Sequence, residues 1–163
     1  MALAATFAAA YAAGVTLLAP ISFSIYQVRV ADVLLPLSVL FGPPAIVGLT
    51  LGTLLGNLSS PFGIVDIVGG SFANFLATLA AWRIGRKQFR GAWLGSTLAE
   101  IATVTLVVGT YLAILLGIPT WVGWALILVG ETISVGIGGY LLLKGVDRAL
   151  GGRPAMRQKL SDT

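Results

Sequence analysis

The stretch "VLLPLSVLFGPPAIVGLTLGTLLGN", residues 33–57, decides how many times this chain crosses a membrane. It is mostly apolar, and the triplet Gly-Pro-Pro at residues 42–44 interrupts it. Proline disrupts a helix interior because it lacks an N–H and its ring clashes with the preceding turn, but it suits the first turn of a new helix. The stretch is therefore either one kinked span over 33–58 or a tight hairpin of two short helices, 33–42 and 44–58.

The composition around this stretch identifies the class of protein. Of the 163 residues, 57% are hydrophobic and only 10% are charged, and the mean hydropathy is +0.96. A soluble domain carries roughly 25% charged residues. Apolar segments also cover 2–20, 64–82, 92–117 and 121–143, and they approach or exceed the length that spans a hydrocarbon core of about 30 Å. The sequence predicts an all-α integral membrane protein with one domain over 1–150 and a flexible cytoplasmic tail over 151–163.

The basic residues indicate the orientation. Nine of the ten lie in two places, between the fourth and fifth segments and after the last one: Arg83, Arg86, Lys87, Arg90, Lys144, Arg148, Arg153, Arg157 and Lys159. Two spans separate these places, so both lie on one face, which the positive-inside rule makes cytoplasmic. Six spans would put Arg29 outside and both termini inside, whereas five spans would put Arg29 inside. Charge counting slightly favours five spans, and the Gly-Pro-Pro break favours six.

Small residues mark the faces where helices approach closely. Three glycines repeat at four-residue spacing at positions 48, 52 and 56, and this ridge suits close helix packing. The first segment carries two alanine ladders: Ala4, Ala8, Ala12 and Ala5, Ala9, Ala13. They predict either packing within the chain or a docking surface for another membrane protein.

Polar residues inside the apolar segments are candidates for function, because a carboxyl group in hydrocarbon is costly. Glu100 and Glu131 are the clearest cases. Helical spacing predicts three half-polar faces: Asp66, Gly70, Asn74, Thr78; Ser96, Glu100, Thr103, Val107, Tyr111; and Trp124, Leu128, Glu131, Val135, Gly138. These faces predict an internal polar cavity. The structural alternatives are interhelical hydrogen bonds, capping of the fourth helix by Asp66, and interfacial positions for the aromatic residues.

The chain offers little for catalysis. It has no histidine and no cysteine, which argues against zinc, haem and iron–sulfur sites. Its two intramembrane glutamates are not paired in sequence for acid–base chemistry, and it carries no nucleotide-hydrolysing motif. We therefore expect no enzyme activity and no cofactor. Transport against a gradient would draw its energy from ions or from a partner.

The stretch "APISFSIYQVRVADVLLPLSVLFGPPAIVGLTLGTLLGNLSSPFGIVDIVGG", residues 19–70, resembles the signature of the QueT family, substrate-binding S components of energy-coupling-factor (ECF) transporters. The positions that carry the resemblance are Gln27, Arg29, Asp32, Leu34, Leu35, Pro36, Gly48, Gly52, Asn57, Leu58, Ser60, Pro61, Phe62, Gly63 and Asp66. Position 32 is aspartate, where the family commonly has glutamate. The six-segment plan fits the whole chain, and the C-terminal half matches mainly in layout.

The resemblance implies six transmembrane helices, the second and third short and joined at the Gly-Pro-Pro turn, with both termini cytoplasmic. It also implies a multi-pass protein of a prokaryotic plasma membrane that works with a transmembrane coupling protein and two ATPase subunits. S components dock through small residues of the first helix, which fits the alanine ladders. The implied solute is vitamin-like or nucleobase-like, with a 7-deazaguanine precursor of queuosine as the candidate.

For such a solute, Glu131 is the expected central anchor, because one carboxylate can accept two adjacent N–H groups. The ring would stack on Trp121, Trp124 or Tyr26, and Gln27 or Asn57 would read its carbonyl. The full set of expected solute-binding residues is Glu131, Gln27, Arg29, Asn57, Asp66, Asn74, Glu100, Trp121, Trp124 and Tyr26.

The polar triad Gln27, Arg29 and Asp32 is expected in an outer loop that covers the cavity. Arg29 would either pair with Asp32 or bond carbonyl groups of the loop. The alternative function is a stand-alone ion-coupled carrier or channel that uses Glu100 and Glu131 as a proton relay.

Overall fold

The structure, a computed structural model, describes residues 1–23, 28–87 and 91–151. In these residues the chain forms six helical segments. They are α1 (Ala2–Leu17) with the short α2 (Ala19–Ser22); the 3-10 helix η1 (Val30–Leu37) with α3 (Ser38–Phe41); α4 (Pro43–Gly56) with the 3-10 turn η2 (Asn57–Ser59); α5 (Gly63–Gly85); α6 (Ala92–Leu116); and α7 (Thr120–Glu131), which continues through the π-helix η3 (Thr132–Gly139) into α8 (Tyr140–Ala149).

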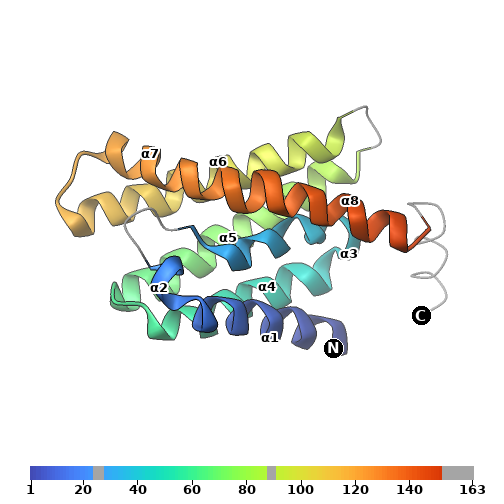
Figure 1. The fold of residues 1–163 in the computed structure, drawn as a ribbon, viewed down its shortest axis with the longest axis horizontal. Helices are drawn as coiled ribbons and strands as arrows, with labels where there is room; N and C mark the ends of the chain where they lie inside the picture. The colour runs from blue at the N-terminus through green and yellow to red at the C-terminus, as the bar shows by residue number, and fades with distance from the viewer. Residues whose placement is uncertain (24–27, 88–90, 152–163) are drawn as a thin grey trace.

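The Gly-Pro-Pro triplet separates two helices. Helix α3 ends at Phe41, and Pro43 is the first residue of α4. Between them Gly42 has a φ of 63°, in the region where a residue with a Cβ is strained. The chain reverses direction at this point (Figure 1). The hairpin interpretation of 33–57 is therefore confirmed, and the single kinked helix is wrong.

Three of the segments are long and apolar enough to cross a membrane: Gly63–Gly85, Ala92–Leu116 and Thr120–Ala149. The segments Ala2–Leu17 and Val30–Phe41 are apolar but shorter. This distribution fits the membrane protein that the composition predicts.

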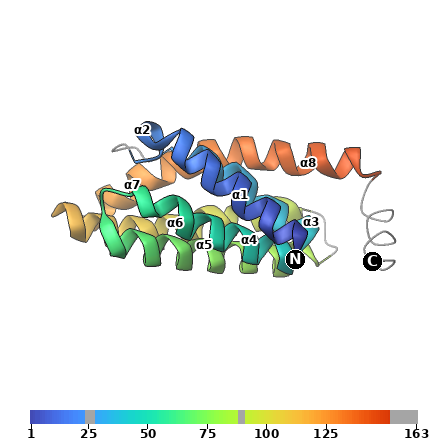
Figure 2. The same cartoon turned by 90° about the horizontal axis from the view of Figure 1, so that it is seen from below.

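Successive segments run in alternating directions, which sorts the connections between two ends (Figure 1). The N-terminus, the last turn of α5, the start of α6 and the last turn of α8 lie at one end. We call it the basic end, because Arg83 and Arg148 lie in these last turns and Arg86 directly follows α5. The opposite end, here called the loop end, carries η2 and the connection between α6 and α7. Figure 2 shows α4, α5 and α6 in one layer, with α1 crossing α4 obliquely.

The glycine ridge of α4 packs against α1. A Cβ added at Gly52 would lie 2.7 Å from the Cβ of Tyr11 and 2.8 Å from the carbonyl oxygen of Ala8. One added at Gly56 would lie 2.9 Å from the Cβ of Val15. Because these distances leave no room for a side chain, the ridge has the close packing that its spacing predicts.

The two alanine ladders of α1 have different surroundings. Ala8 is buried against α4, and Ala4 and Ala12 beside it are half-buried. The ladder Ala5, Ala9 and Ala13 is exposed along its whole length. The first ladder is therefore used for packing within the chain, and the second is left on the surface.

The central element is η1, which contacts α1, α5, η3 and α8. Its approach to the π-helix is close, because a Cβ at Gly139 would lie 2.8 Å from the Cγ of Pro36. Arg29 and Asp32, at the start of this element, are only 4% and 1% exposed. For Asp32 the prediction of an outer covering loop is wrong, because Asp32 lies within η1. Arg29 does lie in the connection that precedes η1, but its side chain is buried. Both side chains enter the bundle because other helices supply polar partners for them.

Candidate functional site

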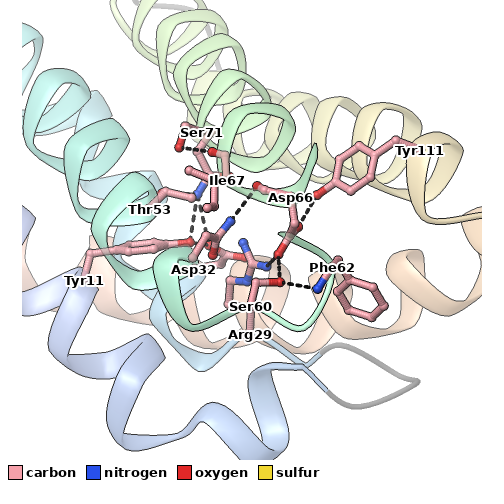
Figure 3. A network of polar contacts seen from close by, with 12 residues as sticks. Tyr11, Arg29, Asp32, Thr53, Ser60, Phe62, Asp66, Ile67, Ser71 and Tyr111 are labelled. Atoms are coloured by element: carbon pink, nitrogen blue, oxygen red, sulfur yellow. Dashed lines mark hydrogen bonds and ion pairs between the residues drawn. The ribbon is translucent and has the colours of Figure 1, made fainter. Parts of the chain in front are cut away.

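Asp32 lies in a polar cluster that joins α1, η1, α4 and α5 (Figure 3). The hydroxyl of Tyr11 donates a hydrogen bond to Oδ1 of Asp32. The side-chain nitrogen of Asn74 lies 2.8 Å from the Tyr11 hydroxyl, 2.8 Å from Oγ1 of Thr53 and 3.4 Å from Oδ1 of Asp32. We call these four residues the Asp32 cluster. Its members are bonded to one another across four elements, so it acts as a tie inside the bundle.

Asp66 organises a second cluster at the loop end (Figure 3). Its Oδ2 accepts a hydrogen bond of 2.5 Å from Ser60, and its Oδ1 accepts one of 2.5 Å from the hydroxyl of Tyr111. The side chain of Asn57 donates to the backbone oxygen of Asp66 at 2.9 Å. Asp66 lies in the first turn of α5, where the helix dipole also favours a negative charge. The side chain of Asp66 does not cap α5, so the capping alternative is wrong; Asp66 instead links η2, α5 and α6.

Arg29 lies beside the second cluster. Its Nη2 is 3.9 Å from Oδ2 of Asp66, and its guanidinium carbon is 5.9 Å from the centre of the Phe23 ring. Among the described residues the ion pair of Arg29 is with Asp66 and not with Asp32, so the expected pairing within the loop is wrong. The partner is different because Oδ1 of Asp32 is already occupied by Tyr11 and Asn74. We call Arg29, Asn57, Ser60, Asp66 and Tyr111 the Asp66 cluster.

The two glutamates have fewer partners. Glu100 is completely buried, and its one described hydrogen bond is a long one of 3.5 Å from Ser38 to Oε1. Glu131 is almost completely buried, at 2% exposure. Oε2 of each glutamate lacks a hydrogen-bond partner within the described part of the chain. A buried acceptor without a donor costs free energy, so these oxygens have unused binding capacity.

The helical rise of about 1.5 Å per residue gives the depth of each group. Asp66 is three residues into α5, about 5 Å from its start at the loop end. Glu131 is eleven residues into α7, about 17 Å from that end, and Glu100 is eight residues into α6, about 12 Å from the basic end. The polar groups therefore form a column from the loop end to beyond the middle of the bundle.

The predicted faces of α5 and α6 contribute to this column. Asp66, Gly70, Asn74 and Thr78 are all buried, as are Ser96 and Glu100. The predicted face of α7 is wrong, because Trp124 and Leu128 are exposed whereas Glu131 and Val135 are buried. The buried side of α7 instead follows Gly123, Ile127 and Gly130.

The tryptophans do not reach the polar column. Trp121 is 70% exposed, and Trp124 is 39% exposed with its indole N–H donating to Thr110 at 2.9 Å. Both lie at the loop end of α7, where aromatic residues often mark a membrane interface. Neither is placed to stack on a solute held by Glu131. The other expected stacking residue, Tyr26, and the expected carbonyl reader, Gln27, lie outside the described residues.

Sequence reasoning missed four members of the two clusters: Tyr11, Thr53, Ser60 and Tyr111. Tyr11 had a usable signal, since it is a lone aromatic hydroxyl in an alanine-rich helix. Tyr111 lies on the predicted face of α6 with Glu100 and was assigned no role. Ser60 is one of the signature positions but was assigned no role, and Thr53 had no signal of its own, because a hydroxyl in a membrane helix commonly bonds its own backbone.

The arrangement favours binding over catalysis. In the described residues no group of three or more histidine, cysteine, aspartate or glutamate side chains could hold a metal ion. What the column offers is a set of buried polar atoms without hydrogen-bond partners: Nη2 of Arg29, Oδ1 of Asn57, and Oε2 of Glu100 and Glu131. Such atoms can bind a small polar solute that supplies both donors and acceptors.

A comparison with known protein families also supports a role in binding a solute. The model of the QueT transporter family matches residues 1–148, which is nearly the whole chain. Comparison with curated proteins and with solved structures gave no match. The family is one of transporters, and the long apolar helices fit a membrane location. The resemblance of residues 19–70 is thus confirmed over the full set of helices, and this chain belongs to the QueT transporter family.

Proposed function

We propose that this protein is the substrate-capture subunit of an ATP-driven, ECF-type importer and is not itself an enzyme. It binds a small nucleobase-like or vitamin-like solute, a 7-deazaguanine precursor of queuosine being the candidate. The observation that carries this proposal is the buried Oε2 of Glu131, an acceptor without a donor among the described residues, about 17 Å inside a transporter bundle.

The chemistry of that acceptor fits the candidate. A 7-deazaguanine ring has N–H donors on its amino edge, and a carboxylate accepts such donors in charge-assisted bonds. Glu100 lies deeper and has a hydroxyl donor on its other oxygen, although at 3.5 Å. Asp66 already has two hydroxyl donors. Glu131 is therefore the acid best suited to the solute, and Asp66 and Asn74 serve mainly to hold the site.

The proposed topology has six crossings, the loop end outside and both termini in the cytoplasm of a prokaryotic cell. It is supported by the alternating segments and by the basic end, since positive residues favour the cytoplasmic side. Arg29 is buried, so labelling must use exposed positions. A cysteine at Ser59 should be labelled from outside and one at Lys87 from inside; the reverse pattern would contradict this topology.

The proposed partners are a transmembrane coupling protein and two ATPase subunits. Ala5, Ala9 and Ala13 are the better docking candidates, because they are exposed while Ala4, Ala8 and Ala12 face α4 or border it. A small-residue face allows another helix to approach closely.

One observation favours the second candidate function, a stand-alone ion-coupled carrier. Glu100 and Glu131 are both buried inside the bundle, and each has an oxygen without a hydrogen-bond partner among the described residues, so both are suited to carry a proton. Reconstitution separates the candidates: uptake into liposomes that requires the coupling protein, the ATPases and ATP supports the importer. Uptake by this chain alone, driven by a proton gradient, supports the carrier.

The solute itself is tested by mass spectrometry of small molecules retained after mild purification. The proposal expects a deazapurine in the wild-type protein and its absence from Glu131→Gln. If the retained molecule belongs to another chemical class and its retention also depends on Glu131, the proposed site stands and the proposed solute is wrong.

A further inference from the structure

The guanidinium of Arg29 is buried with part of its hydrogen-bonding capacity unused. It is 4% exposed, and Nη2 has no hydrogen-bond partner within the described residues. Its nearest described carboxylate oxygen, Oδ2 of Asp66, is 3.9 Å away, which satisfies the charge but is too long for a hydrogen bond. Oδ2 is moreover engaged by Ser60. A buried cationic donor in this position needs an acceptor that the described chain does not supply.

Asn57 presents the opposite deficiency. Its side-chain nitrogen donates to the backbone oxygen of Asp66 at 2.9 Å, which fixes the orientation of the amide. The other side-chain atom, Oδ1, is completely buried and has no hydrogen-bond donor among the described residues. A fixed amide therefore presents one free acceptor.

The two side chains converge over Gly70. A Cβ added there would lie 2.6 Å from Nδ2 of Asn57, 3.7 Å from Nη1 of Arg29 and 3.6 Å from the hydroxyl of Tyr111. The Tyr111 hydroxyl is already committed to Asp66. One free donor and one free acceptor thus belong to neighbouring, positioned side chains at the loop end of α5.

We infer that Arg29 and Asn57 form a subsite that binds a lactam edge, in which a carbonyl oxygen is bonded to the carbon next to an N–H. Arg29 donates to the carbonyl oxygen, and Oδ1 of Asn57 accepts the adjacent N–H. This inference rests on the proposed function and makes it more specific. It assigns the lactam edge of the solute to Arg29 and Asn57 and leaves the exocyclic amino group to Glu131.

The test uses two probes, 7-deazaguanine and 2,6-diamino-7-deazapurine, which differ at this edge. The diamino compound has an amino group in place of the carbonyl and no N–H beside it, so it opposes donor to donor at Arg29. Wild-type protein should bind 7-deazaguanine on the order of 10- to 100-fold more tightly, as expected for a hydrogen bond to a charged group. Binding is measured by calorimetry on the purified full-length chain.

The variants Arg29→Lys and Asn57→Ala should reduce this preference to about threefold or less, chiefly because the protein binds 7-deazaguanine more weakly. Arg29→Lys keeps the positive charge near Asp66 but loses the planar guanidinium group and its fixed N–H donors. Arg86→Lys makes the same chemical change at an exposed position at the basic end and should leave the preference unchanged. Equal weakening of both probes by Arg29→Lys and Asn57→Ala would overturn the subsite and make the two residues purely structural.

The wild-type protein and Glu131→Gln together also decide the question, should Arg29→Lys or Asn57→Ala not fold. Equal binding of both probes, with both lost in Glu131→Gln, overturns the lactam subsite and leaves the proposed function standing. Binding of neither probe overturns the deazaguanine solute of the proposed function and the subsite with it.

Discussion

Asp66 and Glu131 are two acids that are almost equally buried, at 0% and 2% exposure, yet their surroundings differ. Asp66 accepts hydrogen bonds from Ser60 and Tyr111 and has the guanidinium of Arg29 at 3.9 Å. Glu131 has an oxygen with no described donor. Burial alone therefore does not identify a binding residue. The unused hydrogen-bonding capacity distinguishes an acid that holds the fold from one available to a solute.

The largest effect is expected when the partnered acid is removed. Asp66→Ala removes the described ion-pair partner of the buried Arg29 and deprives Ser60 and Tyr111 of their acceptor. The free energy of unfolding should fall by about 3–5 kcal/mol, the usual cost of breaking a buried ion pair. Unfolding in mixed micelles, followed by tryptophan fluorescence, measures it. A loss below about 1 kcal/mol would mean that Asp66 is not structural and that the comparison fails.

Glu131→Gln tests the unpartnered acid. The substitution keeps the volume but replaces an acceptor oxygen with a donor, so 7-deazaguanine binding should weaken by about 2–4 kcal/mol, roughly 30- to 1000-fold. The free energy of unfolding should change by less than about 1 kcal/mol, since no described donor to Oε2 is lost.

Glu100→Gln is the matched control for this titration. It is the same chemical change in another buried glutamate that lies deeper in the bundle. Wild-type affinity in Glu131→Gln together with lost affinity in Glu100→Gln would move the solute site to α6.

Helix α1 offers a similar comparison, between Ala8, which is packed against α4, and Ala9, which is exposed. Ala8→Trp should lower the free energy of unfolding by about 1–3 kcal/mol, because Ala8 contacts Gly52 and the site is already full. Ala9→Trp should leave stability and solute affinity unchanged but prevent co-purification with the coupling protein, because Ala9 is exposed. Normal assembly of Ala9→Trp would exclude this ladder as the docking surface.

The smallest effect is expected from Tyr111→Phe, which removes one of the two hydroxyl donors to Asp66. Asp66 keeps Ser60 and Arg29, so the loss of stability should be about 0.5–1.5 kcal/mol. Comparing it with Asp66→Ala in the same unfolding assay shows how the cluster divides its stabilisation. A loss of stability as large as that of Asp66→Ala would mean that the Tyr111 hydrogen bond alone accounts for the stabilisation by the Asp66 cluster.

Local patterns were sufficient to predict much of the fold. The apolar segments, the break before Pro43 and the ridge that includes Gly52 are properties of neighbouring residues, and all are confirmed. Within the site, the buried face of α5 that carries Asp66 and Asn74 follows from helical spacing alone.

The remaining features depend on contacts between distant segments. Asp32 is stable inside the bundle because Tyr11 and Asn74, which are 63 residues apart, meet beside it. No local pattern contains that meeting. Trp124 was misplaced for another reason: both sides of α7 are apolar, so periodicity does not reveal which side faces lipid.

The shortness of η1 and α3 constrains the order in which the chain enters its membrane during synthesis. With 8 and 4 residues, at about 2.0 and 1.5 Å per residue, they extend about 22 Å, less than a hydrocarbon core of about 30 Å. The segment is too short to be retained by its own hydrophobicity, and it carries Asp32. Its hydrogen-bond donor on α5, Asn74, leaves the ribosome some forty residues later. We therefore expect this segment to stay beside the insertion machinery until α5 arrives, so η1 and α3 reach their place only after the helix α4 that follows them in the sequence.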